Sequence, residues 1–379
     1  MTNHSTPRTD NEPNHGRHGA DRRVRAVLVA LCAFGALRFL FSFCEFTPWI
    51  PKVDFNTRYN EALCLRIGHD PYDVFSDKAS IPCVIPMSRD HHVVNEERLP
   101  SFPAFGKEGQ ETMIVHAYPP WSYAWLLPWT FVSRDVAWLV HLALELASLA
   151  VLFLVPCRYL SRFESAGMLR LAFFAAALNL GKVFPATFMC GNYSTFVAAG
   201  ALGPCVSLDR GRQIPAGLCL ALMMLKPQIG AIFVVPLLLG RRFVAVAVGA
   251  ALCLAGAFWA SSFCDSSVLD MIRNANAAGP VFFNGTALLP TRLLRDVWPN
   301  ASPSVLVPLC AAFGASVCTV ASWRVRKCGP WIERLAPAAL CSLFWMVSRS
   351  YDYAIVLLPL AVIVPILAER RPAFRAGCV

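Results

Sequence analysis

Long apolar runs separated by short polar connections make up most of this chain. A helix crosses the hydrocarbon core of a membrane, ~30 Å thick, when it contains about 20 apolar residues. The runs that have or approach that length are 26–44, 136–157, 168–186, 193–208, 214–225, 228–240, 243–262, 303–322, 333–347 and 353–368. The pattern predicts an all-α fold, a polytopic transmembrane helical bundle of about ten spans.

Three segments depart from simple spans. Runs 214–225 and 228–240 are too short for two full crossings, so we expect two half-helices that meet at a break. Residues 118–132 contain three prolines beside Trp and Tyr, and we expect them to lie flat at the outer interface. Apolar residues recur at helical spacing over 55–67, which predicts an amphipathic helix on the outer membrane surface, within the first long loop.

Composition supports a membrane protein. Apolar residues make up 56% of the 379 residues and charged residues only 15%, and the mean hydropathy is +0.49. A soluble domain carries about 25% charged residues to cover its surface. These values exclude a set of soluble domains, and they also exclude a disordered, collagenous or disulfide-rich secreted chain.

Basic residues gather in the connections between apolar runs. The formal net charge is +10, and such an excess normally faces anionic lipid in the cytoplasm, so it does not indicate nucleic acid binding. Three arginines precede the first apolar run, and the later clusters are Arg158, Arg162 and Arg170; Arg210 and Arg212; Arg241 and Arg242; Arg324, Arg326 and Lys327; Arg370, Arg371 and Arg375. If every cluster is cytoplasmic, both termini lie inside and the other connections face outward.

This topology divides the chain into three parts. We expect a disordered cytoplasmic tail over 1–23, an integral membrane domain over 24–370 and a cytoplasmic tail over 371–379. Residues 45–117 and 263–302 form the two long outer loops. The protein is expected to be a multi-pass protein of the cell membrane.

The cysteines and histidines do not indicate a metal site. Most of the 15 cysteines lie in apolar runs, and no C-x-x-C or Cys/His ligand spacing occurs. The sequence allows a disulfide between Cys64 and Cys83 in the first outer loop if that loop faces an oxidising compartment, and it does not decide between the bridged and the free thiols. No D-x-D sequence is present, so we expect neither a metal nor another cofactor.

The unusual polar sequences fall on the outer side of this topology. They include Asp54, Tyr118-Pro119-Pro120, Gly191-Asn192, Lys226-Pro227-Gln228, Asn284-Gly285-Thr286 and Arg349 to Tyr353. A transport path would instead place polar groups at mid-depth in two halves of an internal repeat. The distribution favours one reaction cavity that opens at the outer leaflet.

Two charged residues are the main chemical candidates. Asp54, at the start of the amphipathic helix, is placed to accept a proton from a sugar hydroxyl, although a helix N-cap explains it as well. Lys226 has no charged neighbour for a dozen residues on either side, so its ammonium is a candidate to neutralise a phosphate. A lysine that extends from a helix end to the membrane surface is the alternative.

Other polar residues are candidates for binding. Arg349 and Asp352 either contact phosphate or sugar or pair with each other. Neutral hydrogen-bond partners for sugar hydroxyls are Asn192, Gln228 and Asn284, two of which also lie in glycan acceptor sequons. Tyr118 is either part of an interface turn or a stacking surface for a sugar or lipid.

Taken in order, these motifs resemble glycosyltransferase family 87 (the DUF2029 group), within the C superfamily of membrane glycosyltransferases. The pattern of that family begins with D-F-x-x-Y-x-x-A-x-x-L-x-x-G-x-D/N-P-Y. It is matched, with one extra residue of spacing, by Asp54, Phe55, Tyr59, Ala62, Leu65, Gly68, Asp70, Pro71 and Tyr72. The later elements are matched by Tyr118-Pro119-Pro120, Gly191-Asn192, Lys226-Pro227, Asn284-Gly285-Thr286 and Tyr351-Asp352-Tyr353. This chain departs from the family pattern at two places: Asn192 stands where Gln is commoner in the family, and the last element lacks the His that many members carry beside the Asp.

The resemblance implies transfer of mannose or arabinose from a polyprenyl-phosphate sugar donor to a glycan or glycolipid acceptor at the outer face, with inversion. It implies Asp54 as the catalytic base, Lys226 and Arg349 at the donor phosphate, and sugar or acceptor contacts from Tyr118, Asn192, Gln228, Asn284 and Asp352. Membrane lipids are the other expected partners. The competing interpretations are a multi-pass lipid or sugar transporter or flippase, a non-catalytic scaffold, and a ligase that uses diphosphate donors.

Overall fold

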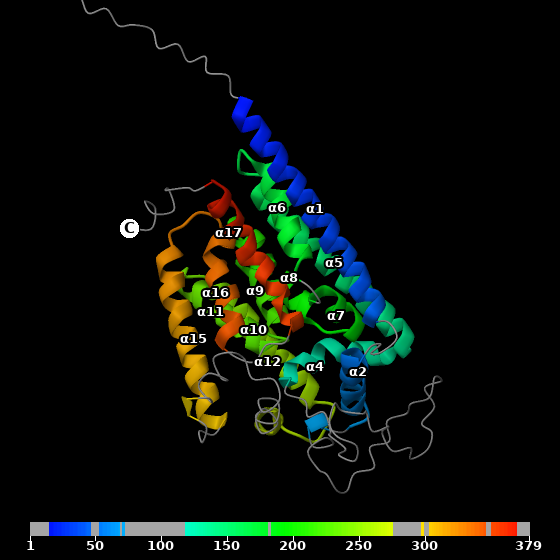
Figure 1. The fold of residues 1–379 in the computed structure, drawn as a ribbon. Helices are drawn as coiled ribbons and strands as arrows, with labels where there is room; N and C mark the ends of the chain where they lie inside the picture. The colour runs from blue at the N-terminus through cyan, green and yellow to red at the C-terminus, as the bar shows by residue number, and fades with distance from the viewer. Residues whose placement is uncertain are drawn as a thin grey trace, which may run out of the picture.

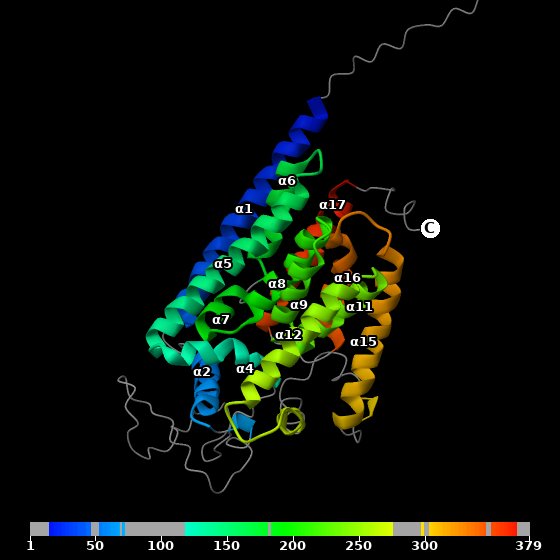
Figure 2. The ribbon, with the colours of Figure 1, turned by 180° about the vertical axis from the view of Figure 1, so that it is seen from behind.

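The structure is a computed structural model that describes residues 15–46, 53–68, 70–72, 118–180, 183–275, 297–298, 303–345 and 350–369. Within these ranges the regular structure is helical and no strand occurs. The helices pack into an elongated bundle, shown from two sides in Figures 1 and 2. The prediction of an all-α fold is therefore confirmed for the described part of the chain.

The longer helices form the body of the bundle. They are α1 (His15–Phe46), α5 (Arg134–Leu160), α6 (Ala166–Leu178), α8 (Ser194–Asp209), α9 (Gln213–Met223), α12 (Phe243–Ser261), α15 (Pro303–Val325), α16 (Trp331–Trp345) and α17 (Leu357–Glu369). Shorter elements lie between them: α2 (Val53–Arg66), α4 (Pro120–Leu126), η1 (Leu127–Phe131), α7 (Val183–Cys190), α10 (Pro227–Gly230), η2 (Ala231–Phe233), α11 (Val234–Leu239) and η3 (Ser350–Val356).

Four of the described helices are long and apolar enough to cross a membrane. They are Arg22–Ser42 within α1, Arg134–Leu160, Phe243–Ser261 and Pro308–Val325 within α15. Shorter apolar helices are Ala166–Leu178, Gln213–Met223, Pro227–Leu239 and Asp352–Ala368. A membrane protein is thus supported, whereas the predicted number of about ten spans stays a prediction.

Two boundaries differ from the sequence prediction. Helix α1 begins at His15, inside the tail 1–23 that we expected to be disordered, and no proline interrupts the chain from there to the first apolar run. The run 168–186 is split between α6 and α7. At the end of α6, Asn179 donates hydrogen bonds to the carbonyls of Ala175 and Leu31, which fixes α6 against α1.

The run 118–132 forms the short elements α4 and η1. Pro119 is the N-cap of α4 and Pro120 is its first residue, where a proline costs the helix no hydrogen bond. A seven-residue helix is about 10 Å long, so α4 does not cross a membrane. In Figure 1, α4 lies across the end of the bundle beside α2, and it packs on α12.

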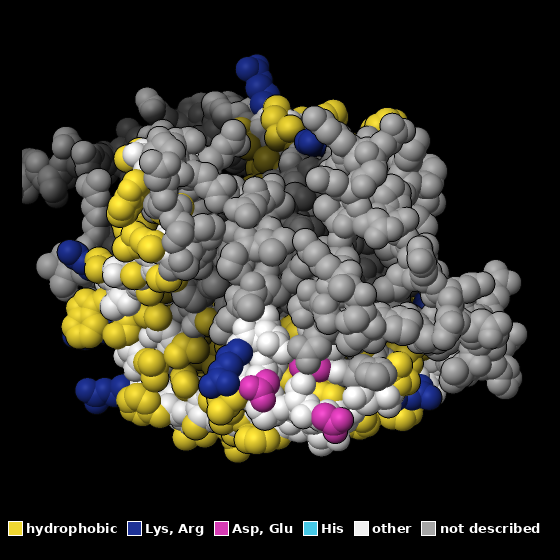
Figure 3. All heavy atoms as spheres, turned by 90° about the horizontal axis from the view of Figure 1, so that it is seen from below, with side chains coloured by type: hydrophobic (Ala, Val, Ile, Leu, Met, Phe, Trp, Pro, Cys, Tyr) yellow, Lys and Arg dark blue, Asp and Glu magenta, His cyan; other side chains and the backbone are white. Residues whose placement is uncertain are grey.

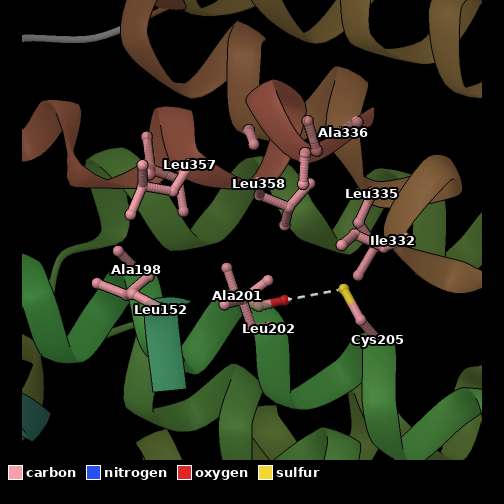
Figure 4. Close-up of a cluster of buried hydrophobic side chains, with 14 of the residues drawn as sticks. Leu152, Ala198, Ala201, Leu202, Cys205, Ile332, Leu335, Ala336, Leu357 and Leu358 are labelled. Carbon is pink, nitrogen blue, oxygen red and sulfur yellow. Dashed lines mark hydrogen bonds between the residues drawn. The ribbon is translucent and has the colours of Figure 1, made fainter. Parts of the chain in front are cut away.

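The main core lies where α5, α8, α16 and α17 meet. Figure 4 shows its centre, in which Ala201 and Leu202 of α8 face Leu335 of α16 and Leu358 of α17. Small residues on α8 allow the helices to approach closely, while the Cys205 thiol donates a hydrogen bond to the Ala201 carbonyl of its own helix. This packing holds the carboxyl half of the chain against α8 and thereby fixes the loop that precedes α8.

The two ends of the bundle differ in composition. At one end, Asp209 accepts a hydrogen bond from the Trp331 backbone N–H at 2.9 Å and lies 4.0 Å from Arg162, and the Arg242 guanidinium lies 5.2 Å from the Trp331 ring. The basic connections between α5 and α6, between α8 and α9, between α11 and α12 and between α15 and α16 therefore meet there. The amino end of α1 and the carboxyl end of α17 point the same way (Figures 1 and 2). The membrane side that this end faces stays a prediction.

The opposite end carries α2 and α4. Seen from that end, the described part of the surface is mainly hydrophobic toward its margin, with scattered charged side chains (Figure 3). Helix α2 contacts η1 and α4, and its Tyr59 hydroxyl donates a hydrogen bond to the Val132 carbonyl at 3.0 Å. The predicted amphipathic helix is therefore formed, and its apolar face packs on the bundle.

Candidate active site

Helix α2 places Asp54 in its first turn. One face of α2 is apolar and buried against the bundle. It consists of residues three or four positions apart: Phe55, Tyr59, Ala62 and Leu65. The Phe55 ring packs edge-on against Trp138 of α5 with 5.2 Å between ring centroids. Because this face is anchored, the adjacent carboxylate of Asp54 is held at the edge of the bundle and remains half-buried.

A glycine lets the chain bring Asn192 next to Asp54. Gly191 has a φ of +68°, in the left-handed region that favours glycine. A Cβ at this position would lie only 2.6 Å from Cβ of Phe55 and 2.7 Å from the Trp138 ring. No other residue type fits this close approach between the loop and α2. The Gly191-Asn192 pair thus has a direct geometric explanation.

Five polar side chains form one hydrogen-bonded group, which we call the Lys226 network: Asp54, Asn192, Ser194, Lys226 and Asp352. Asn192 Nδ2 donates to Asp54 Oδ2 at 2.7 Å, and Lys226 Nζ lies 2.5 Å from Asn192 Oδ1. Lys226 Nζ also donates to Ser194 Oγ at 2.6 Å and to Asp352 Oδ1 at 2.7 Å. Asp54 and Lys226 are therefore joined through a single amide.

Apart from Asp54, the side chains of the network are buried. Lys226 is only 1% exposed and Asp352 3%, and the two form a buried ion pair. A buried charge is tolerated when an opposite charge and hydrogen bonds compensate for lost water. The network combines side chains from α2, the loop before α8, the α9–α10 break and η3. These elements are far apart in the sequence and converge only in the fold.

The break at Lys226 is closed by α4. Helix α9 ends at Met223, and Pro227, which has no N–H, begins α10. The backbone carbonyls that the break leaves without helical partners accept hydrogen bonds from α4: Trp121 Nε1 donates to Met224 O at 2.7 Å, and Ser122 Oγ donates to Leu225 O at 3.1 Å. The predicted break between two half-helices is therefore present, and α4 stabilises it.

Tyr118 is fixed beside the network by α2. The Arg58 guanidinium lies 3.8 Å from the centroid of the Tyr118 ring and forms an ion pair with Glu61 at 2.7 Å. Tyr72 donates a hydrogen bond from its hydroxyl to the Tyr118 carbonyl. Burial raises the pKa of the Tyr72 hydroxyl well above its ordinary value, so it remains protonated and able to donate. The Tyr118 ring also packs edge-on against Tyr193, with centroids 6.2 Å apart.

The structure therefore brings together Asp54, Tyr118, Asn192, Lys226 and Asp352 of the predicted site residues, and Gln228 follows on α10. Their chemical roles stay predictions. Asn284 and Arg349 lie outside the described residues, as does Cys83, so their predicted roles and the Cys64–Cys83 bridge are untested. Within the described ranges, no three His, Cys, Asp or Glu side chains converge as metal ligands.

Sequence reasoning missed Ser194, which it treated only as part of a sequon. The Ser194 hydroxyl contacts Asn192, Lys226 and Asp352, as described above. The signal that was available is its position two residues after Asn192, at the start of an apolar helix. There its backbone N–H can bond the Asn192 side chain, and it does so at 3.1 Å.

A second buried polar group, which we call the Glu145 cluster, comprises His141, Glu145 and Thr195. His141 Nε2 lies 3.9 Å from Glu145 Oε1, beyond hydrogen-bond distance. His141 Nε2, both Glu145 carboxyl oxygens and the Thr195 hydroxyl have no hydrogen-bond partner among the described residues. His141 and Glu145 stand four residues apart in an apolar run, and this spacing was the available sequence signal.

Comparisons with known proteins address the family directly. A sequence model of glycosyltransferase family 87 matches residues 116–349, which is more than half of the chain. No curated protein and no solved structure matches. The matched range includes Asn192, Ser194 and Lys226, whereas Asp54 and Asp352 lie outside it. The chain belongs to glycosyltransferase family 87, and with its apolar helices it is a membrane glycosyltransferase.

Proposed function

We propose that this glycosyltransferase moves mannose or arabinose from a polyprenyl-phosphate donor to a glycan or glycolipid acceptor at the outer face of the cell membrane. The observation that supports this function is the hydrogen bond that joins Asp54 of α2 to Asn192 and, through this amide, to Lys226. Helix α2 lies at the end of the bundle opposite the basic connections. In this proposal the acceptor approaches Asp54, the half-buried member of the network, on α2. Neither a metal nor another cofactor is proposed.

Asp54 acts as the base in this proposal. It lies in the first turn of α2, near the amino end of the helix. The acceptor hydroxyl gives its proton to the carboxylate while its oxygen forms a bond to the anomeric carbon of the donor. The bond from that carbon to the phosphate oxygen breaks, and the polyprenyl phosphate leaves with the electron pair. A single displacement of this kind inverts the anomeric configuration.

The remaining candidates surround the reacting groups in this proposal. Tyr118 lies beside the network, half-buried, and offers a ring and a hydroxyl to the sugar or the acceptor. Gln228 and Asn284 offer amides. Arg349 stands three positions before Asp352 in the chain and is the candidate cation for the donor phosphate.

The experiment that tests this function uses the purified full-length protein in proteoliposomes. Polyprenyl-phosphate mannose and polyprenyl-phosphate arabinose, each labelled in the sugar, are supplied separately with a membrane glycolipid extract as acceptor. We expect transfer from one of the two donors and no transfer from a labelled nucleotide sugar. Transfer from the nucleotide sugar alone would contradict the proposed donor class.

A second arm tests the side of the reaction. A single cysteine is introduced at the α2 end of the molecule in a variant whose native cysteines are replaced, and a membrane-impermeant thiol reagent is added to proteoliposomes of known orientation. We expect the reagent to reach this cysteine from the outer face and a cysteine near Trp331 only from the inner face. The reverse labelling pattern would contradict an outer active site.

A further inference from the structure

The orientation of the Asn192 amide is set by its neighbours. Its Oδ1 lies 2.5 Å from Lys226 Nζ and accepts from the Ser194 backbone N–H at 3.1 Å. If the amide were turned by 180°, its NH₂ group would face an ammonium and its oxygen would face a carboxylate, and both contacts would be repulsive. The donor side of the amide is therefore directed at Asp54.

The Lys226 ammonium is fully engaged in holding this arrangement. An ammonium has three hydrogens, and among the described residues Lys226 donates to three acceptors, in Asn192, Ser194 and Asp352. The two lone pairs of Asn192 Oδ1 are taken by Lys226 and the Ser194 N–H, so the single hydrogen of the Ser194 hydroxyl goes to Asp352 Oδ1, 2.6 Å away. In this arrangement no Lys226 hydrogen remains for a phosphate.

Opposite charges face each other along the network. The Asp352 carboxylate faces the Lys226 ammonium, which faces the oxygen of the Asn192 amide, and the NH₂ group of that amide faces the Asp54 carboxylate. A cation on an amide oxygen strengthens the N–H donors of the same amide, and hydrogen bonds in a chain polarise one another. Asn192 Nδ2 holds Asp54 Oδ2 at 2.7 Å. The Asp54 carboxylate is thus fixed by a chain of contacts that begins at the buried ion pair.

We infer that Lys226, Ser194 and Asp352 are positioning residues that act on the reaction through Asn192, by fixing the carboxylate of Asp54, and that Lys226 is not a ligand of the donor phosphate. This inference rests on the proposed role of Asp54 as the base. It replaces the expectation, taken from the sequence, that Lys226 binds the phosphate and that Asn192 and Asp352 bind the sugar.

The test separates binding of the lipid phosphate from turnover. Its probe is polyprenyl phosphate, the lipid product for either sugar, and its main variant is the double substitution Lys226→Met with Asp352→Leu. Removing both charges avoids leaving one buried charge uncompensated. The thermal unfolding midpoint of the variant is measured first, to establish that the protein is folded. The Kd for polyprenyl phosphate and the kcat of sugar transfer are then measured.

The expected result is a kcat lower by about 10²-fold, because a base displaced by ~1 Å loses that much rate, with the Kd for polyprenyl phosphate unchanged. A Kd that rises as steeply as kcat falls would make Lys226 a phosphate ligand and overturn the inference. An unchanged kcat would overturn it as well, because the network would then have no influence on Asp54.

One further variant and one matched pair extend the test. Asn192→Asp keeps the size of the side chain but replaces the donor to Asp54 by a carboxylate, so we expect a loss of kcat near that of the double variant, again with the same Kd. Ser194→Ala removes one buried hydroxyl from the network, and Ser342→Ala removes one that bonds only within α16. We expect kcat to fall for Ser194→Ala and to stay at the wild-type value for Ser342→Ala; equal values in the two would contradict the inference.

The variant Asp54→Asn distinguishes a failure of this inference from a failure of the proposed function. If Asp54→Asn keeps full activity, the proposed base is wrong and the inference falls with it. If Asp54→Asn is inactive while Asn192→Asp and the double variant keep wild-type kcat, the proposed base stands and only the positioning role is refuted.

Discussion

Two polar groups lie buried in the same apolar bundle, and they differ in how far their hydrogen bonds are satisfied. In the Lys226 network, the ammonium meets three acceptors and the opposing carboxylate of Asp352 receives two donors. In the Glu145 cluster, the carboxyl oxygens have no hydrogen-bond partner among the described residues, and the closest basic atom, on His141, is 3.9 Å away.

The difference indicates what each group does for the protein. Burying a charged or polar group is unfavourable unless its partners replace the water it loses. The Lys226 network meets this condition and therefore acts as a rigid support. The Glu145 cluster does not meet it, so it lowers the stability of the fold. Replacing Asp352 by an apolar residue should consequently lower the free energy of unfolding, whereas replacing Glu145 should raise it.

The largest expected effect is that of Lys226→Leu alone. It leaves the Asp352 carboxylate buried without its cation, so the free energy of unfolding should fall by about 3–5 kcal/mol. Thermal unfolding followed by tryptophan fluorescence measures this change. The double variant Lys226→Leu with Asp352→Leu should recover most of the loss. A single variant as stable as the wild type would mean that the network does not support the fold.

The next effect concerns the loop that carries Asn192. Gly191→Ala introduces a Cβ into the contact with Phe55 and Trp138 at a positive φ, and we expect a loss of about 2–3 kcal/mol. The matched control is Gly167→Ala in α6, where a Cβ meets no atom within 4 Å, and its stability should not fall. Equal unfolding midpoints for the two variants would refute the close approach of the loop to α2.

A gain in stability is expected for Glu145→Leu. The substitution removes a buried carboxyl group that has no hydrogen bond of normal geometry among the described residues and replaces it by an apolar side chain of similar size, so the free energy of unfolding should rise by about 1–2 kcal/mol. The companion variant Asp352→Leu should be less stable than the wild type. If Glu145→Leu is also less stable, the contrast between the two buried acids is wrong.

The smallest expected effect is that of Ser122→Ala, where α4 contacts the α9–α10 break. Ser122→Ala removes the hydrogen bond to the Leu225 carbonyl at the α9–α10 break, which should cost about 1 kcal/mol. Ser262→Ala, at an exposed serine whose hydroxyl bonds to the carbonyl of Trp259, serves as the control and should change the unfolding midpoint less. The reverse order would show that α4 does not stabilise the break.

The sequence was most informative where a single rule determines the outcome. The apolar runs predicted an all-helical membrane protein, Pro227 predicted the helix break, and the spacing after Asp54 predicted α2. It was less informative at boundaries that depend on tertiary contacts. The run 168–186 is split at Asn179, whose side chain bonds to α1 as well as to α6, and such a contact cannot be inferred from hydropathy.

The candidate site was predicted as a set of residues but not as a network. Sidedness alone suggested that Asp54 and Lys226 lie at the same end of the molecule. That the ammonium of Lys226 is saturated by three acceptors depends on segments that are more than thirty residues apart in the chain, and no local pattern encodes it. Ser194 was missed for the same reason, because its role follows from its position between Lys226 and Asp352.

The most direct test of this account is the rate of sugar transfer by the variant Asp54→Asn. An asparagine keeps the size of the side chain but cannot accept the proton of the acceptor hydroxyl. We expect the initial rate to fall by about 10²–10⁴-fold, while the thermal unfolding midpoint and the Kd for polyprenyl phosphate stay at their wild-type values. Transfer at the wild-type rate by this variant would contradict the assignment of Asp54 as the base.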